Sequence, residues 1–109
     1  AQSKIQKGWT VKAIYDEDLM IGFTMYGYCY EYGFYEICRF MIDYKYQGKG
    51  YGRRALVKII EEMKENEECK DIYISFDPKN NIARSLYESL GFKDTGKVLE
   101  EELLFKLEE

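Results

Sequence analysis

The feature that most constrains this chain is a glycine-rich loop between an apolar segment and an amphipathic segment. Glycines occupy positions 48, 50 and 52, an apolar run at 40–42 precedes them, and apolar residues at helical spacing follow. Alternate glycines permit a tight strand-to-helix turn and let a bulky group approach the backbone. Because a helix would begin here, its unpaired amides and its dipole favour an anion. The stretch therefore predicts a cradle for a pyrophosphate.

Two better-known phosphate loops do not fit this spacing. A Walker loop needs Ser or Thr after its Gly-Lys pair to hold magnesium, whereas here Gly48 and Lys49 are followed by Gly50. The dinucleotide-binding fingerprint needs a third glycine three residues after the second, where this chain has Arg53. A plain turn between a strand and a helix is the structural alternative.

Composition and charge narrow the classes of protein further. The chain has 109 residues, 46% of them hydrophobic and 33% charged, which is typical of one globular domain. No apolar run approaches the roughly 20 residues of a membrane span, and no signal peptide opens the sequence. We therefore expect a cytoplasmic protein without a membrane partner. The net charge of -4 also argues against a nucleic-acid partner, although basic residues gather near the loop at Lys45, Lys49, Arg53, Arg54 and Lys58.

The cysteines point to neither disulfides nor a metal. Cys29, Cys38 and Cys69 are odd in number and widely separated, and the chain has no histidine. A disulfide framework or a zinc site would show paired spacings, and a nucleophilic cysteine would usually need a basic partner. We expect buried, reduced thiols and no metal.

Hydrophobic periodicity predicts alternating strands and helices. Apolar residues alternate in the strands and recur at helical spacing in the helices. The expected strands are 9–15, 19–30, 34–43 and 71–76, and the expected helices are 51–64 and 81–90. In the third strand, the alternation would place Glu36 on the same face as Cys38, Phe40 and Ile42. The helix at 51–64 would connect two parallel strands as a right-handed unit.

A second constellation of residues lies roughly thirty positions after the loop, at Asn80, Ala83, Tyr87, Glu88 and the pair at 91–92. By itself it is a helix with an Asn N-cap and a glycine stop. Together with the Gln-x-x-Gly-x-Gly spacing of the loop, it resembles the signature of the GNAT superfamily of N-acetyltransferases. The resemblance extends from about residue 9 onward. The runs 22–26, 40–43 and 86–88 are most similar to bacterial spermine/spermidine acetyltransferases.

The resemblance implies an α/β (α+β) fold in one domain spanning 1–109. The sheet would be mixed and mostly antiparallel, with a strand, helix and parallel strand holding acetyl-CoA. Helix propensity alone favours a helical tail, but the resemblance implies terminal strands near 95–99 and 103–107. The strand and two helices that usually open this fold are missing. The chain is then a truncated fragment, a partner subunit fills the gap as in a homodimer, or the acceptor site is open.

The resemblance also implies the site residues. Tyr87 would give a proton to the departing CoA thiolate, with a core-packing tyrosine as the alternative. Glu36 would take the proton from the amine, with a solvated strand end and removal by water as the alternatives. The Phe40 amide would stabilise the oxyanion. The expected contacts with acetyl-CoA are Phe40, Met41, Ile42, Gln47, Gly48, Lys49, Gly50, Tyr51, Gly52, Arg53, Asn80 and Ala83.

The implied reaction is direct acetyl transfer from acetyl-CoA to a small primary amine, with a polyamine such as spermidine or spermine as the expected acceptor. Aromatic and acidic residues could wall a groove for a polycation, namely Tyr26, Tyr28, Tyr30, Glu31, Tyr32, Tyr35 and Glu36. The same cofactor residues would serve an enzyme acting on a protein or peptide amine, or a CoA-binding module without catalysis.

Overall fold

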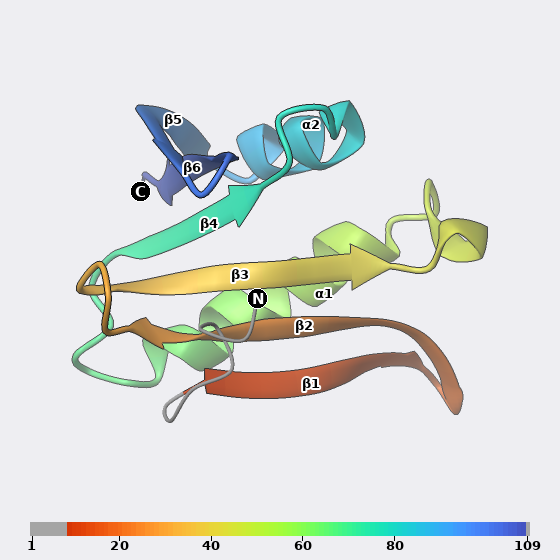
Figure 1. The fold of residues 1–109 in the computed structure, drawn as a ribbon. Helices are drawn as coiled ribbons and strands as arrows, with labels where there is room; N and C mark the ends of the chain where they lie inside the picture. Colours follow the sequence, from red (N-terminus) through yellow and green to blue (C-terminus); the bar gives the residue numbers. More distant parts are fainter. Residues whose placement is uncertain (1–8, 109) are drawn as a thin grey trace.

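One six-stranded sheet and two α-helices account for most of the computed structural model, which describes residues 9–108. The strands and helices follow one another along the chain (Figure 1) as β1 (Trp9–Asp16), β2 (Leu19–Cys29), β3 (Phe34–Ile42), the short 3₁₀ helix η2 (Tyr44–Tyr46), α1 (Tyr51–Lys64), β4 (Ile72–Phe76), α2 (Asn81–Ser89), β5 (Phe92–Leu99) and β6 (Glu102–Leu107). The predicted mixed fold is confirmed.

The strand order in the sheet is β1-β2-β3-β4-β6-β5. Among the strands of residues 9–108, only β3 and β4 pair in parallel, and α1 connects them as the sequence predicted. Both helices pack on the same face of the sheet, because Leu56 and Ile59 of α1 share one core cluster with Tyr87 of α2. Ile37 and Ile74 supply the sheet side of that cluster.

The tail forms the two strands that the family resemblance implied, rather than a helix. β6 lies between β4 and β5, so it pairs on both edges. Its consecutive residues Leu104 and Phe105 point to opposite faces and are both buried. Pairing and burial on two faces outweigh the helix propensity of this leucine- and glutamate-rich segment.

A β-bulge interrupts the pairing of β2 with β3. Met25 pairs with Arg39, but the next residue of β2, Tyr26, pairs with Ile37. Cys38 is therefore an extra residue in β3. A bulge bends its strand and increases the local twist, and this one comes directly after the last residue of β3 that pairs with β4.

The bulge makes one expectation about β3 wrong. Regular alternation would put Glu36 and Phe40 on one face. In the structure, Ile37 is in the core beneath the helices and Phe40 packs against that same core. Glu36 lies on the opposite face, where its carboxylate accepts a hydrogen bond from Ser75. The extra residue shifts the alternation by one position, which a uniform period of two does not anticipate.

Beyond the bulge, β3 and β4 separate. Residues 35–37 of β3 pair with 72–74 of β4, and no later pair joins these two strands within the described part of the chain. Figure 1 shows the two strands diverging toward the ends that lead to the glycine loop and to α2. β4 continues to pair with β6 on its other edge. The separation exposes one edge of β3.

Cys29, Cys38 and Cys69 are buried, as the sequence predicted, and none of them forms a disulfide among residues 9–108. Between residues 9 and 108, no three His, Cys, Asp or Glu side chains gather in a way that could hold a metal ion. No helix in that range has both the length and the apolar character needed to cross a membrane.

Candidate functional site

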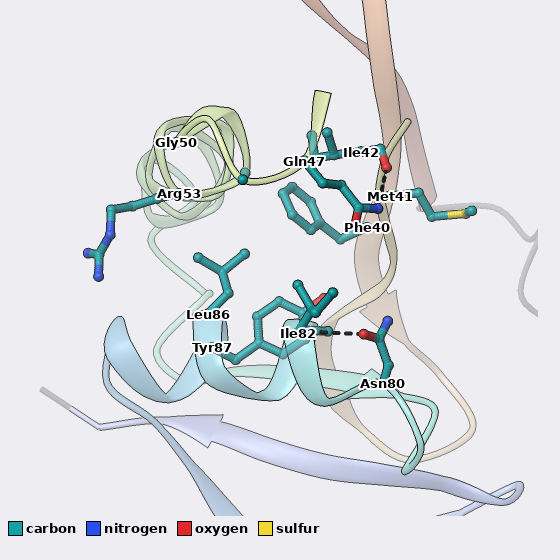
Figure 2. Close-up of a pocket in the computed structure, with 13 residues that line it drawn as sticks. Phe40, Met41, Ile42, Gln47, Gly50, Arg53, Asn80, Ile82, Leu86 and Tyr87 are labelled. Atoms are coloured by element: carbon teal, nitrogen blue, oxygen red, sulfur yellow. Dashed lines mark hydrogen bonds between the residues drawn. The ribbon is translucent and has the colours of Figure 1, made fainter. Parts of the chain in front are cut away.

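A cavity of about 400 Å³ lies between the glycine loop, the exposed edge of β3 and the start of α2. Figure 2 shows its walls, with Leu86 and Tyr87 projecting from α2 toward Phe40 and the loop. The residues that line it are Phe40, Met41, Ile42, Gln47, Gly48, Gly50, Gly52, Arg53, Asn80, Ile82, Ala83, Leu86 and Tyr87. The two motifs of the sequence therefore meet in one place.

The loop turns sharply between β3 and α1. The Asp43 carboxylate accepts a hydrogen bond from the Lys45 amide at 3.0 Å and so begins the short helix η2. Gly48 and Gly50 have φ values of +79° and +83°, in the left-handed region that favours glycine. The Gln47 side chain donates from Nε2 to the Ile42 carbonyl at 3.0 Å, which ties the loop back to β3.

The loop presents unpaired amides. The first backbone amide of α1 with a protein acceptor is that of Arg54, which donates to the Gly50 carbonyl at 3.2 Å. Among residues 9–108, the amides of 48–53 have no hydrogen-bond acceptor in the protein. No side chain of the described residues caps the start of α1 either. These donors lie at the positive end of a 14-residue helix, where an anionic group is favoured.

The exposed edge of β3 supplies a second row of backbone groups. The Asp43 amide donates to the Ile21 carbonyl of β2 at 2.6 Å. Because successive residues of a strand direct their amides and carbonyls to alternate edges, Phe40 and Ile42 direct theirs away from β2, toward the cavity. This edge can pair with an extended ligand as a further strand would.

The start of α2 forms the opposite wall. Asn80 caps the helix, and its Oδ1 accepts a hydrogen bond from the Ala83 amide at 3.0 Å, drawn as a dashed line in Figure 2. This cap uses only the side-chain oxygen. The two donors of the Asn80 amide group remain beside the cavity, and Asn80 is a lining residue.

Tyr87 lies at the inner end of the cavity. Its side chain is 3% exposed, and its ring packs edge-on against Phe76, Phe40 and Phe92, with centroid distances of 5.0, 6.5 and 6.1 Å. Its hydroxyl has no hydrogen-bond partner among residues 9–108. Every fully buried polar side-chain atom in that range does have a partner, so the Tyr87 hydroxyl is not fully buried. The hydroxyl is therefore open to the cavity. Burial, and secondarily the charge of Glu102, raises the pKa of Tyr87 well above its usual value, so the hydroxyl stays protonated.

Ten of the twelve predicted cofactor contacts line this cavity, together with Tyr87. Lys49 and Tyr51 do not. The Tyr51 hydroxyl instead donates to the Asp16 carboxylate at 2.8 Å, and the Arg54 guanidinium lies over the Tyr51 ring. Glu36 is also outside the cavity, on the other face of β3. Two further residues line the cavity and were not among the predicted contacts, Ile82 and Leu86. Their spacing of four, one turn apart on α2, was the available signal.

The cavity wall is mainly apolar. Within the described part of the chain, Arg53 is the only charged residue that lines it, and its guanidinium donates to the Ser89 hydroxyl of α2 at 2.8 Å. Arg54 and Lys58 line a different cleft, between α1 and the β1–β2 hairpin. The basic residues near the loop are therefore not gathered at one site, and among the described residues only Arg53 adds a side-chain charge to the cavity wall.

The expected tyrosine groove does not form as one surface. Tyr26, Tyr28, Tyr30 and Tyr35 line a separate cleft of about 280 Å³ with Glu62 of α1. The Tyr26 hydroxyl donates to the Glu62 carboxylate at 2.8 Å. Tyr32 and Glu36 do not line this cleft: Tyr32 stacks on Phe34, and Glu36 follows Tyr35 on the opposite face of β3. Alternation along the strands separates residues that are close in sequence.

The arrangement suits one elongated ligand. Free amides at a helix start bind an anionic end, an apolar trough with a strand edge binds a flexible arm, and a protonated hydroxyl lies at the far end. That hydroxyl could donate a proton to a group leaving at the tip of the arm.

Residues 3–92 match the family model described as "Acetyltransferase (GNAT) family". A curated relative, spermine/spermidine N(1)-acetyltransferase of Bacillus subtilis (strain 168), is 38% identical over 91 residues, which cover 78% of this chain and 60% of the relative. The chain therefore spans about three fifths of the length of that relative.

Solved structures share the fold. A PaiA N-acetyltransferase from Thermoplasma acidophilum, in complex with coenzyme A, superposes with a TM-score of 0.78 at 17% identity, over 94% of this chain and 62% of the other. The ribosomal-protein-S18-alanine N-acetyltransferase of Escherichia coli gives a TM-score of 0.74 at 20% identity, over 97% of this chain and 72% of the other. At these sequence identities, the two matches show a shared fold.

Proposed function

This chain belongs to the acetyltransferase (GNAT) family, and from that premise we propose that it transfers the acetyl group of acetyl-CoA directly to a primary amine, with a polyamine as the acceptor. The observation that carries the proposal is the row of unpaired amides at 48–53, which opens onto a cavity ending at Tyr87. Pyrophosphate, pantetheine arm and thioester would occupy the three parts of that cavity in order.

The residues have distinct roles in this proposal. The amides of 48–53, with Arg53 nearby, hold the pyrophosphate. The edge of β3 at Phe40 and Ile42 pairs with the pantetheine arm, and Asn80 and Ala83 contact the arm from α2. Gln47 acts indirectly, since its side chain donates to the Ile42 carbonyl and thereby fixes the loop. Lys49 and Tyr51 contribute through their backbone amides.

The chemistry needs two proton movements. The neutral amine attacks the thioester carbonyl, the C–N bond forms and the C–S bond breaks. The Phe40 amide stabilises the developing oxyanion. Tyr87 gives its proton to the CoA thiolate as that leaves. An alkylammonium with a pKa near 10.4 is deprotonated in only about one molecule in a thousand at pH 7, which costs roughly 4 to 5 kcal/mol. Glu36, or water, accepts that proton.

The polyamine acceptor rests on the Bacillus relative, whose name gives spermine and spermidine as its substrates. A net charge of -4 also favours a cationic acceptor. Transfer to a protein or peptide amine would use the same acetyl-CoA-binding residues, so an experiment has to distinguish the two classes of acceptor. A CoA-binding module without catalysis is the remaining alternative.

The test is a panel of acceptors with free thiol release as the readout. The chain is incubated with acetyl-CoA and spermidine, spermine or peptides with free N-termini, and coenzyme A binding is measured by calorimetry. Thiol release with the polyamines and not with the peptides is the expected result. Thiol release with the peptides alone would show that the acceptor is a protein or peptide amine and not a polyamine. Binding of coenzyme A without release for any amine would indicate a non-catalytic module.

A further inference from the structure

A buried hydroxyl–carboxylate pair lies at the point where β3 and β4 separate. The Ser75 hydroxyl of β4 donates to the Glu36 carboxylate of β3 at 2.6 Å. Glu36 is 4% exposed and Ser75 is 7% exposed. A hydrogen bond of this length to a carboxylate is charge-assisted and stronger than one between neutral groups. It joins two strands that otherwise pair over three residues each.

The position of the pair connects it with the cavity. The last paired residues of the two strands are Ile37 and Ile74. Glu36 precedes one of them and Ser75 follows the other, so the hydrogen bond spans the end of the paired segment. Past this point no further residue pairs join the two strands within the described part of the chain. The cavity lies on the helix side of the sheet, and the pair lies on the other side.

We propose that Ser75 is a positioning residue that holds the Glu36 carboxylate, in its ionised form, at the end of the paired segment to accept the proton of the attacking amine. The inference rests on the proposed function. The Ser75 hydroxyl does not touch the reacting atoms; it acts through Glu36. By donating to the charged form, it favours the carboxylate over the carboxylic acid. Without this donor, the equilibrium between carboxylate and carboxylic acid shifts toward the acid, so Glu36 would be protonated at a higher pH.

Other titratable groups lie near Glu36 in the sheet. By strand register, Cys38 follows on its own strand, Tyr73 is its neighbour on β4, and Lys106 of β6 pairs with Tyr73. On β2 the residue opposite Glu36 is Gly27, which brings no side chain, and Cys29 lies beyond it on the same face. These groups are identical in the wild type and in a Ser75 variant. A shift between the two therefore reports on the hydroxyl.

The test is the pH dependence of kcat/KM for Ser75→Ala with one acceptor. Loss of a hydrogen bond to a charged group should move the acidic limb upward by about one pH unit, a roughly tenfold loss on that limb. The affinity for coenzyme A should be unchanged. Ser75→Thr retains the hydroxyl and should restore the wild-type profile. Titration of the amine cancels, because the acceptor is the same throughout.

Thr95→Val is the matched control. Thr95 lies on β5, and its partly buried hydroxyl donates to the Leu104 carbonyl at 2.8 Å. The acidic limb of this variant should not move. An unshifted limb in Ser75→Ala, or an equal shift in both variants, would overturn the role of Ser75 while leaving acetyl transfer intact. Absence of thiol release by the wild type would overturn the proposed function and this role with it. If Ser75→Ala does not fold, Ser75→Cys, a weaker donor, must show a smaller shift in the same direction.

Discussion

Replacing Tyr87 by Phe separates chemistry from packing at the inner end of the cavity. The change removes one oxygen and keeps the ring that packs against Phe76 and Phe92. Since the hydroxyl has no protein partner among residues 9–108, its loss should change the free energy of unfolding by less than about 1 kcal/mol. Loss of a general acid should lower kcat by about 10²- to 10⁴-fold, or roughly 3 to 5 kcal/mol in activation free energy.

The assay pairs thiol release with calorimetric measurement of coenzyme A affinity, which should stay within about twofold. Tyr35→Phe is the control, because Tyr35 is partly buried, lies outside the cavity and accepts a hydrogen bond from Asn66 at 3.2 Å. Its turnover should match the wild type. An equal loss of turnover and affinity in Tyr87→Phe would assign Tyr87 to structure, and unchanged turnover would remove it from the chemistry.

Three further predictions follow from the loop, the α2 cap and the buried phenol. Gly50→Val should abolish coenzyme A binding, measured by calorimetry, because it adds a side chain at a position that lines the cavity. Gly96→Val is the control and should bind normally: its backbone strain is similar, at φ +81° against +83° for Gly50, and both positions have open space around them. Equal loss in both variants would point to strain alone. Asn80→Ala should cost about 1 kcal/mol and lower the Tm by about 4 °C in thermal unfolding, whereas Asn81→Ala should not; equal Tm values would contradict the cap. Because burial raises the pKa of Tyr87, the acid form persists as pH rises, so kcat should show no Tyr87-dependent decline below about pH 10; a decline that disappears in Tyr87→Phe would contradict this.

The local elements could be predicted from sequence because short-range rules determine them. The α1 boundaries agree with the prediction of 51–64, since glycines precede the helix and polar residues follow it. The Asn80 cap of α2 is likewise a contact between residues three positions apart. The glycine loop and the second constellation could be brought together only through the family resemblance, because nothing local relates residues thirty positions apart.

The sequence by itself determined where the chain turns, where its helices begin and which backbone amides remain free, since each depends on neighbouring residues. The tertiary structure decided which face of β3 carries Glu36 and where β3 leaves β4. Both depend on the bulge at Cys38, and that Cys38 is an extra residue can be recognised only from the pairing of β3 with β2. A bulge is a mismatch between two strands, so no periodicity within one strand can reveal it.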